Sequence, residues 1–292
     1  MACAALEIGD GSLMIPLRPG NTARRLGCAG GIILAAFAAV SWSATGFGDW
    51  RDTISRQAGT FPMLRPAKLH YAFGWSGFTA AEADATFGRS ESGKCKLDLK
   101  ARTVGFVRSL WKMDTTASSN CSQTTLRPLK LTQTESYAKK TLTTSVDFSP
   151  EGATQLRVRT PADRSSPRPK AFGFPDLHDL NSALLFIRSQ PLAQADSMNL
   201  CVYPASAPYL ATVTVLGREK IKVAGRKWEA IKADLKLVAV KDDLTLKPHA
   251  KFKKATAWLS DDRDRLLLKV EAEVFVGSVW AELQNFEFPG GG

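Results

Sequence analysis

The 292-residue sequence is poor in the side chains on which most catalytic and metal sites depend. Its only three histidines, His70, His178 and His249, lie far apart and lack the spacing of metal ligands. No Gly-x-Ser-x-Gly elbow, Walker loop or dinucleotide-binding glycine pattern is present. These absences favour a protein that is not an enzyme and that needs no metal or cofactor.

Basic residues are plentiful, but no tight tract of them occurs. The chain has 39 Lys and Arg against 28 Asp and Glu, a formal net charge of +11. The densest basic group is Lys251, Lys253 and Lys254. Without a helix-turn-helix, zinc-finger or RNP pattern to place side chains on bases, we expect no nucleic-acid partner. The excess charge is better suited to anionic surfaces such as lipid headgroups.

Only one long apolar run is present, and it lies near the N-terminus. No charged residue occurs between Arg25 and Asp49, and residues 26–40 are almost wholly apolar or small. Basic residues precede this run and small residues follow it, which is the order of a signal peptide. The sequence therefore predicts export from the cytoplasm.

Residues 1–46 are accordingly predicted to be a signal peptide or an N-terminal anchor. Cleavage after Ser43 or Gly46 fits equally well. If the segment is kept, residues 26–48 are long enough to span a bilayer and would tether the protein to the inner membrane. A lipoprotein is not expected, because Cys28 precedes most of the apolar run. Whether the chain starts at Met1 or at Met14 stays open.

The rest of the chain alternates apolar and polar residues in short segments separated by turns, which predicts β-strands. In residues 266–276 every second residue is apolar, and Gly277 follows where a hairpin turn is expected. Residues 231–237 repeat the pattern. With residues 47–64 as a linker, we expect residues 65–288 to form a single mainly β domain. It would be a curved antiparallel sheet or open barrel of about ten to twelve strands.

Two short helices are predicted to cover this sheet. Residues 104–112 have helical apolar spacing, and residues 177–190 have it more clearly, with Asp176 as the N-cap. His178 and Asp179 would lie in the first turn of the second helix. We expect these two polar side chains to anchor that helix by hydrogen bonds.

Apolar side chains are concentrated around both predicted helices. The candidates for lining an apolar cavity beneath them are Trp75, Phe106, Trp111, Leu180 and Leu184. Such a pocket would suit a lipid-like ligand, since ligand pockets are mostly apolar with few polar groups. The same side chains would also form a solid core, which we favour.

The five cysteines separate into two groups. Cys3 and Cys28 would leave with the signal peptide, so the exported domain would keep Cys95, Cys121 and Cys201. An odd number cannot all pair. In an oxidising compartment we expect a disulfide between Cys95 and Cys121, with Cys201 as a buried strand residue.

Six separated motifs occur in one order along the chain. They are YAFGWSGFTAAEA (71–83), LWKMD (110–114), TLRPL (125–129), DLHDLNSAL (176–184), RSQPL (188–192) and ATAWLSDD (255–262). In this arrangement the sequence resembles the exported "domain of unknown function 3108" family over residues 65–288. The resemblance implies a bacterial envelope protein with a curved, mostly antiparallel sheet, more loosely similar to the half-barrel carriers of lipoproteins and lipids. It implies no catalytic residues.

These observations predict an exported, periplasmic envelope protein without catalytic activity that binds or carries an apolar ligand, such as lipid or an acylated protein. The alternative is a structural or interaction module whose exposed sheet edge docks another envelope protein. Neither reading requires a cofactor.

Overall fold

The computed structural model describes residues 49–90, 92–162, 166–248, 252–274 and 277–289. One sixteen-stranded sheet dominates it, accompanied by two short α-helices and one 3-10 turn. The prediction of a curved, mainly antiparallel sheet with two short helices is confirmed. The expected ten to twelve strands were too few. The predicted signal or anchor, residues 1–46, lies outside the described residues.

The helical elements are η1 (Trp50–Thr53), α2 (Gly105–Leu110) and α3 (Leu180–Ser189). The strands are β1 (Ala67–Trp75), β2 (Phe78–Arg89), β3 (Lys94–Thr103), β4 (Met113–Ser122), β5 (Pro128–Tyr137), β6 (Thr141–Ser149), β7 (Gly152–Thr160), β8 (Lys170–Phe172), β9 (Leu177–His178), β10 (Ser197–Val202), β11 (Tyr209–Val223), β12 (Arg226–Val240), β13 (Leu246–Pro248), β14 (Phe252–Ser260), β15 (Leu267–Val274) and β16 (Ser278–Glu287). No helix in the described ranges is both long and apolar enough to cross a membrane.

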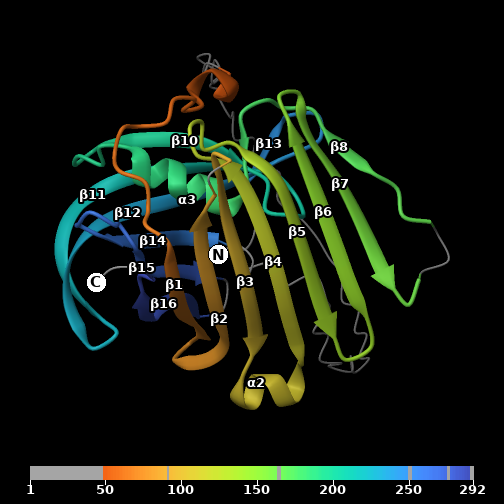
Figure 1. Cartoon of the computed structure of the whole chain (residues 1–292), viewed down its shortest axis with the longest axis horizontal. Helices are drawn as coiled ribbons and strands as arrows, with labels where there is room; N and C mark the ends of the chain where they lie inside the picture. Colours follow the sequence, from red (N-terminus) through yellow and green to blue (C-terminus); the bar gives the residue numbers. More distant parts are fainter. Residues whose placement is uncertain (1–48, 91, 163–165, 249–251, 275–276, 290–292) are drawn as a thin grey trace, which may run out of the picture.

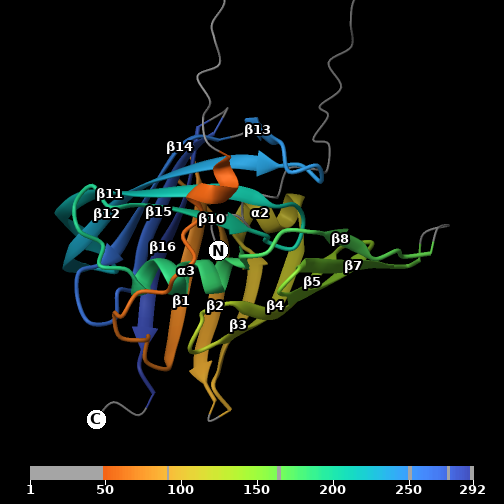
Figure 2. The same cartoon turned by 90° about the horizontal axis from the view of Figure 1, so that it is seen from above.

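The sheet runs from β8 through β7, β6, β5, β4, β3, β2 and β1, then through β16, β15, β14, β12, β11 and β10 to β9, with β13 beside β12. Among the strand pairs of the described residues, only β9–β10 is parallel. Most neighbours in the sheet are also neighbours in the chain, as in a meander. Figures 1 and 2 show the β1–β8 wall on one side and the β10–β12 strands on the other, with α3 between them.

Alternating burial explains why the chain folds as this sheet. In β15, Leu268, Val270 and Ala272 are buried while the residues between them are not, which places every second side chain in the core. Register shifts at Phe73/Gly74 in β1–β2 and at Val215/Gly217 in β11–β12 bend the sheet, since an extra residue on one strand increases the local twist. The sheet therefore curls instead of lying flat.

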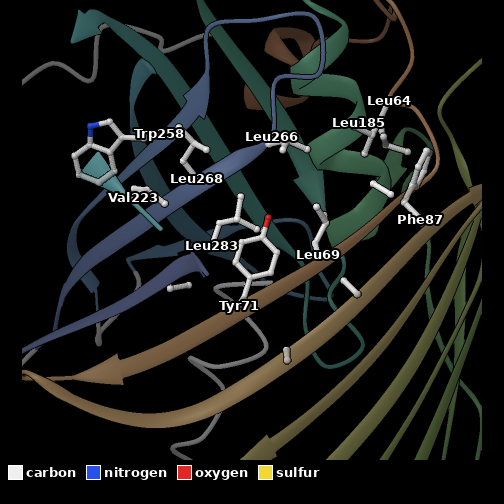
Figure 3. Close-up of a cluster of buried hydrophobic side chains, with 14 of the residues drawn as sticks. Leu64, Leu69, Tyr71, Phe87, Leu185, Val223, Trp258, Leu266, Leu268 and Leu283 are labelled. Atoms are coloured by element: carbon white, nitrogen blue, oxygen red, sulfur yellow. The ribbon is translucent and has the colours of Figure 1, made fainter. Parts of the chain in front are cut away.

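The concave side of the curled sheet is filled by apolar side chains. Figure 3 shows Leu69 and Tyr71 from β1, Leu268 from β15 and Leu283 from β16 pointing into one cluster, which Leu185 from α3 also joins. All five are buried, and the Tyr71 hydroxyl donates a hydrogen bond of 2.8 Å to a backbone carbonyl of β15. A solid core occupies the space in which a cavity was considered.

Side-chain contacts, not a strand ladder, join the two ends of the sheet. The Tyr203 hydroxyl, just after β10, donates to the Gln155 side-chain oxygen of β7 at 2.8 Å. The Gln155 amide donates to the carbonyl of Ala205, also at 2.8 Å. The rings of Phe172 and Tyr203 lie 5.9 Å apart. The sheet is thus an open barrel whose seam is closed by buried side chains.

The segment that was predicted to be a linker, residues 47–64, packs against the sheet from residue 49 onward. Ile54 is buried and forms a parallel bridge with Asn199 of β10, and the Ser55 amide donates to the Asn199 carbonyl at 2.8 Å. The Trp50 indole donates to the Leu244 carbonyl at 3.0 Å. The described part of this segment belongs to the folded domain.

Candidate functional site

The five residues proposed to line one apolar pocket do not come together, so this prediction is corrected. Trp75 and Phe106 are 50% and 76% exposed, at the end of the sheet where α2 lies. Trp111 is half-buried and stacks on Tyr137, with ring centroids 6.2 Å apart. Leu180 and Leu184 belong to α3, where both are only partly buried. Helix α2 buries none of its own residues, so it does not cover the sheet.

Two open depressions lie on the described surface. One, of about 550 Å³, lies on the outer face of β2–β5 and is lined by side chains such as Lys96, Lys100, Thr116 and Thr132. The other is bounded by Phe61 and the 261–265 loop. Both are too open to enclose a lipid chain, because ligand pockets bury most of the ligand surface.

Asp179 holds the start of α3 from within the core. Its carboxylate accepts a hydrogen bond of 2.7 Å from the Ser182 amide, and the Ser182 hydroxyl meets the Asp179 amide at 3.0 Å, which together form a capping box. The other carboxylate oxygen accepts from the Ser119 hydroxyl of β4. Burial raises the pKa of Asp179 above its ordinary value. One side chain therefore caps the helix and ties it to the wall of the sheet.

His178 lies beside this cap but not in the helix, which corrects its predicted place in the first turn. It ends β9, and its ring nitrogens face the Ser182 hydroxyl at 3.3 Å and the Arg127 guanidinium at 3.4 Å. Its ring also packs edge-on against Phe186, with centroids 5.1 Å apart. Burial, and secondarily Arg127, lower the pKa of His178 to about 3.

His178, Asp179 and Ser182 include the residue types of a hydrolytic triad, but their geometry does not match one. In a triad the histidine bridges serine and carboxylate, whereas His178 bridges Ser182 and Arg127. All three side chains are buried from solvent. This cluster is suited to positioning α3 and not to acting on a substrate.

Asp176, predicted to be the N-cap of this helix, has another role. Its backbone adopts φ +64°, and its carboxylate pairs with Arg56 at 2.8 Å and with Arg127 at 2.7 Å. These contacts join the segment just after η1, the β4–β5 connection and the β8–β9 connection. Asp176 therefore stabilises the entry to β9, three residues before the actual cap.

A second polar cluster, which the sequence did not indicate, holds the other end of α3. Arg188, in the last turn, donates to the Asp264 carbonyl at 2.9 Å. Arg265 donates in return to the Arg188 carbonyl at 2.7 Å and to the Pro191 carbonyl at 3.0 Å, and its guanidinium stacks on Phe61. Both arginines are buried, and burial lowers the pKa of Arg188 to about 10. We call this pair the arginine clamp.

Among the described residues, no three His, Cys, Asp or Glu side chains gather as metal ligands would. His70 hydrogen-bonds the Asp84 carboxylate at 2.8 Å on the outer face of the sheet. His249 lies outside the described residues.

Cys95 and Cys121 lie directly opposite each other on β3 and β4. The structure describes both as free, buried thiols that hydrogen-bond to each other. This hydrogen bond, and secondarily burial, raise the pKa of Cys121, whereas the same hydrogen bond lowers that of Cys95. Cys201 is buried separately in β10, and burial raises its pKa to about 12. The two thiols predicted to pair are therefore cross-strand neighbours.

We predict that Cys95 and Cys121 form a disulfide in an oxidising compartment. Denatured protein from that compartment should gain two more alkyl groups, measured by mass, when it is reduced before alkylation. The closed loop should stabilise the fold by about 3 kcal/mol. Replacing Cys201 with serine should leave the two-group difference intact, and replacing Cys95 should abolish it. Equal alkylation with and without reduction would contradict the disulfide.

Large apolar side chains are exposed together at one end of the sheet. Trp75 and Phe78 face each other across the β1–β2 turn and are 50% and 71% exposed, while Phe106 and Leu110 of α2 are 76% and 72% exposed. Figure 1 shows the β1–β2 turn and α2 at the same end. We call these four residues the apolar rim.

Local contacts hold α2 beside the β1–β2 turn. The Val104 amide, just before α2, donates to the Ala80 carbonyl of β2 at 3.0 Å. Arg108 fixes the helix from its other side, because its guanidinium makes two bonds of 2.8 and 3.1 Å to the Asp114 carboxylate. The exposure of Phe106 and Leu110 thus follows from a defined attachment of α2 to the sheet.

These features define a class: a barrel-like, mainly β protein. The concave side of its open sheet is filled by apolar side chains and covered by α3, and buried side chains close the seam between the two ends of the sheet. Within that class, the chain belongs to the family described as "Protein of unknown function (DUF3108)", whose model matches residues 68–284. The resemblance noted in the sequence is confirmed. No curated protein matches the chain.

Three solved structures resemble this fold at low sequence identity. A beta-barrel-like protein of domain of unknown function DUF1849 from Brucella abortus has 9% identity and a TM-score of 0.50, over 79% of this chain and 100% of that chain. A candidate exported protein with a YmcC-like fold from Bacteroides fragilis has 8% identity and a TM-score of 0.35, over 79% and 99%. A candidate lipoprotein from Parabacteroides distasonis has 8% and 0.31, over 80% and 100%. The first likeness supports the barrel-like fold, and at these identities it shows nothing more.

Proposed function

We propose that this protein works outside the cytoplasm as a non-enzymatic envelope protein that contacts a lipid surface through the apolar rim. The export part rests on the apolar run at residues 26–40 and the basic residues before it. The observation that carries the lipid contact is the exposure of Trp75, Phe78, Phe106 and Leu110 at one end of the sheet. Exposed apolar groups gathered in this way mark interaction surfaces.

Basic side chains beside the rim favour an anionic lipid surface over an apolar protein groove. Lys112 lies two residues after the end of α2, and Lys139 and Lys140 lie in the β5–β6 turn; all three are exposed. Lys140 lies 5.1 Å from the ring centre of Tyr137, on which Trp111 stacks. Aromatic side chains at the interface and lysines near the headgroups are the usual combination at membrane surfaces.

The packed core is more consistent with lipid contact at the surface than with a lipid carried inside the sheet. The concave side that would hold a carried lipid is occupied by side chains from β1, β15, β16 and α3. An acyl chain would need to displace close-packed groups, at a cost similar to that of an overpacked core. A lipid-exposed rim needs no rearrangement, because its side chains are already outside.

We expect the double substitution Phe78→Ser and Phe106→Ser to lower partitioning of the full chain onto phosphatidylglycerol-containing vesicles by at least tenfold. Each buried phenylalanine contributes about 2 kcal/mol to such transfer. Vesicle co-sedimentation measures the partitioning, and hydrogen exchange should show protection at residues 75–78 and 105–110. The parent chain should also bind purely zwitterionic vesicles more weakly.

The matched control replaces two exposed leucines at the opposite end of the sheet, Leu129→Ser with Leu246→Ser. This control should partition like the parent chain. Because every variant keeps residues 26–48, a difference among them reports on the domain itself. If the rim variant and the control bind alike, the rim is not the lipid-contact surface.

A further inference from the structure

The outer face of the β1–β8 wall carries a block of hydroxyl side chains with no charged residue among them. Strand register places six of them in two rows across β4, β5 and β6: Thr116, Thr134 and Thr143 in the first row, and Ser118, Thr132 and Ser145 in the second. We call these six residues the hydroxyl grid. We propose that the grid, together with Lys100, binds an acidic glycan, that is, a chain of sugar rings that bear carboxylates.

The hydroxyl grid faces away from the core. The residues between its members point to the inner side of the wall, where the Ser119 hydroxyl donates to Asp179 at the start of α3. Figures 1 and 2 show α3 and the β10–β12 strands on that inner side. Apart from a 3.4 Å contact between Thr134 and Thr143, the grid hydroxyls make no hydrogen bond to any described residue. They can therefore bond to a ligand without first breaking contacts to that part of the chain.

The grid differs in chemistry from the outer faces of other strands in the same sheet. There β15 presents Lys269, Glu271 and Glu273, and β2 presents Glu82 and Asp84. Charges of both signs are the usual way to keep an exposed face soluble. Threonine suits a strand by propensity, but propensity does not explain six adjacent positions that all present a hydroxyl. Each hydroxyl can donate and accept a hydrogen bond, as the hydroxyls of a sugar also do.

The shape of this face suits an extended chain of sugars better than a compact ligand. The open depression of about 550 Å³ over β2–β5 is lined by four members of the grid, Thr116, Ser118, Thr132 and Thr134. Neighbouring strands lie about 4.8 Å apart, and alternate residues of one strand about 7 Å apart. A ligand that crosses the strands therefore meets a new hydroxyl at each of them. Contacts repeated along one chain reinforce each other, so the surface need not enclose the ligand.

Lys100 supplies the charge that favours an acidic glycan over a neutral one. It extends the first row of the grid onto β3 and makes no ion pair with any described residue. Its neighbour on β2, Asp84, is hydrogen-bonded to His70 at 2.8 Å. Asp98, which extends the second row, is paired with Lys96 at 2.9 Å. The grid thus ends at an uncompensated ammonium group, which can donate to a sugar carboxylate.

The test compares two matched sugars, cellohexaose and the corresponding hexamer of glucuronic acid, by calorimetric titration of the full chain. The acidic hexamer should bind saturably, and cellohexaose roughly fivefold more weakly. Thr116→Val with Thr134→Val should weaken both sugars about tenfold, because valine keeps the shape of threonine without its hydroxyl. Lys100→Gln should weaken only the acidic hexamer, also about tenfold. Amide chemical shifts that change on binding should cluster in β4, β5 and β6.

The matched control, Thr79→Val with Thr256→Val, removes two hydroxyls from strand positions outside the grid. It should bind both sugars like the parent chain. Valine suits a strand as well as threonine does, so all variants should fold, which the midpoint of thermal unfolding checks. Equal weakening in this control, no saturable binding of the acidic hexamer, or an equal effect of Lys100→Gln on both sugars would each overturn the proposal. It is independent of the lipid contact, because the apolar rim is formed by other residues.

Discussion

Replacing Arg265 with alanine should lower the free energy of unfolding by about 3 kcal/mol. The buried guanidinium donates to the carbonyls of Arg188, Gln190 and Pro191 at the end of α3. Each buried carbonyl that is left without a donor lowers the stability by roughly 1–3 kcal/mol. Water that enters the vacated space can hydrogen-bond these carbonyls and reduce this loss. The substitution also removes the stacking on Phe61. Urea unfolding should show a lower midpoint at an unchanged slope.

Arg263→Ala is the control for this experiment. Arg263 lies in the same loop but is exposed, so its loss should change stability by no more than about 0.5 kcal/mol. Arg188 makes the reciprocal contacts: its guanidinium donates to the Asp264 carbonyl at 2.9 Å and to the Arg265 carbonyl at 3.1 Å. If Arg265→Ala were as mild as Arg263→Ala, the clamp would not position α3.

The strand pattern could be predicted because one face of most strands is buried. Alternation in residues 231–237 and 266–276 predicted parts of β12 and β15 directly. The strand count was too low partly because β8, β9 and β13 are only three, two and three residues long. Strands of this length carry no periodicity, and only their partners in the sheet define them.

The start of α3 was misplaced because two aspartates precede it. Asp176 and Asp179 are equally good N-cap residues by type. Residues 177–178 instead pair with Cys201 and Val202 of β10 as β9, so the helix begins later and Asp179 forms the capping box with Ser182. A contact more than twenty residues away in the sequence decides between the two, and local pattern does not contain it.

The rim shows why aromatic residues alone do not predict a cavity. Phe106 and Leu110 have the spacing of a helix face that would be buried, yet α2 attaches to the sheet through backbone and through Arg108. Whether such a face points inward depends on where β2 and β4 place the helix. The arginine clamp could not be predicted from the sequence either. Arg188 lies at the end of α3 and Arg265 in the connection between β14 and β15, so only the fold brings them together, and they share no motif.

Acid should destabilise this protein through His178. Burial lowers the pKa of this side chain from 6.5 to about 3, and Arg127 adds to the effect. Protonation is therefore easier in the unfolded chain than in the folded one. The stabilisation from neutral His178 is complete above pH 6.5 and is lost as the pH falls from 6.5 toward 3. Each pH unit in that range costs about 1.4 kcal/mol.

We expect the parent chain to lose about 2–3 kcal/mol more than His178→Gln between pH 6.5 and pH 4.5, measured by urea unfolding at each pH. Glutamine keeps a hydrogen-bonding group near Ser182 and Arg127 but has no proton to gain. Titration of Asp179 and of the other carboxylates occurs in both chains, so it cancels in the difference. His70→Gln, which replaces a histidine on the outer face, should retain the parent's acid sensitivity. If His178→Gln were as acid-sensitive as the parent, the buried neutral histidine would not be the source of this acid sensitivity.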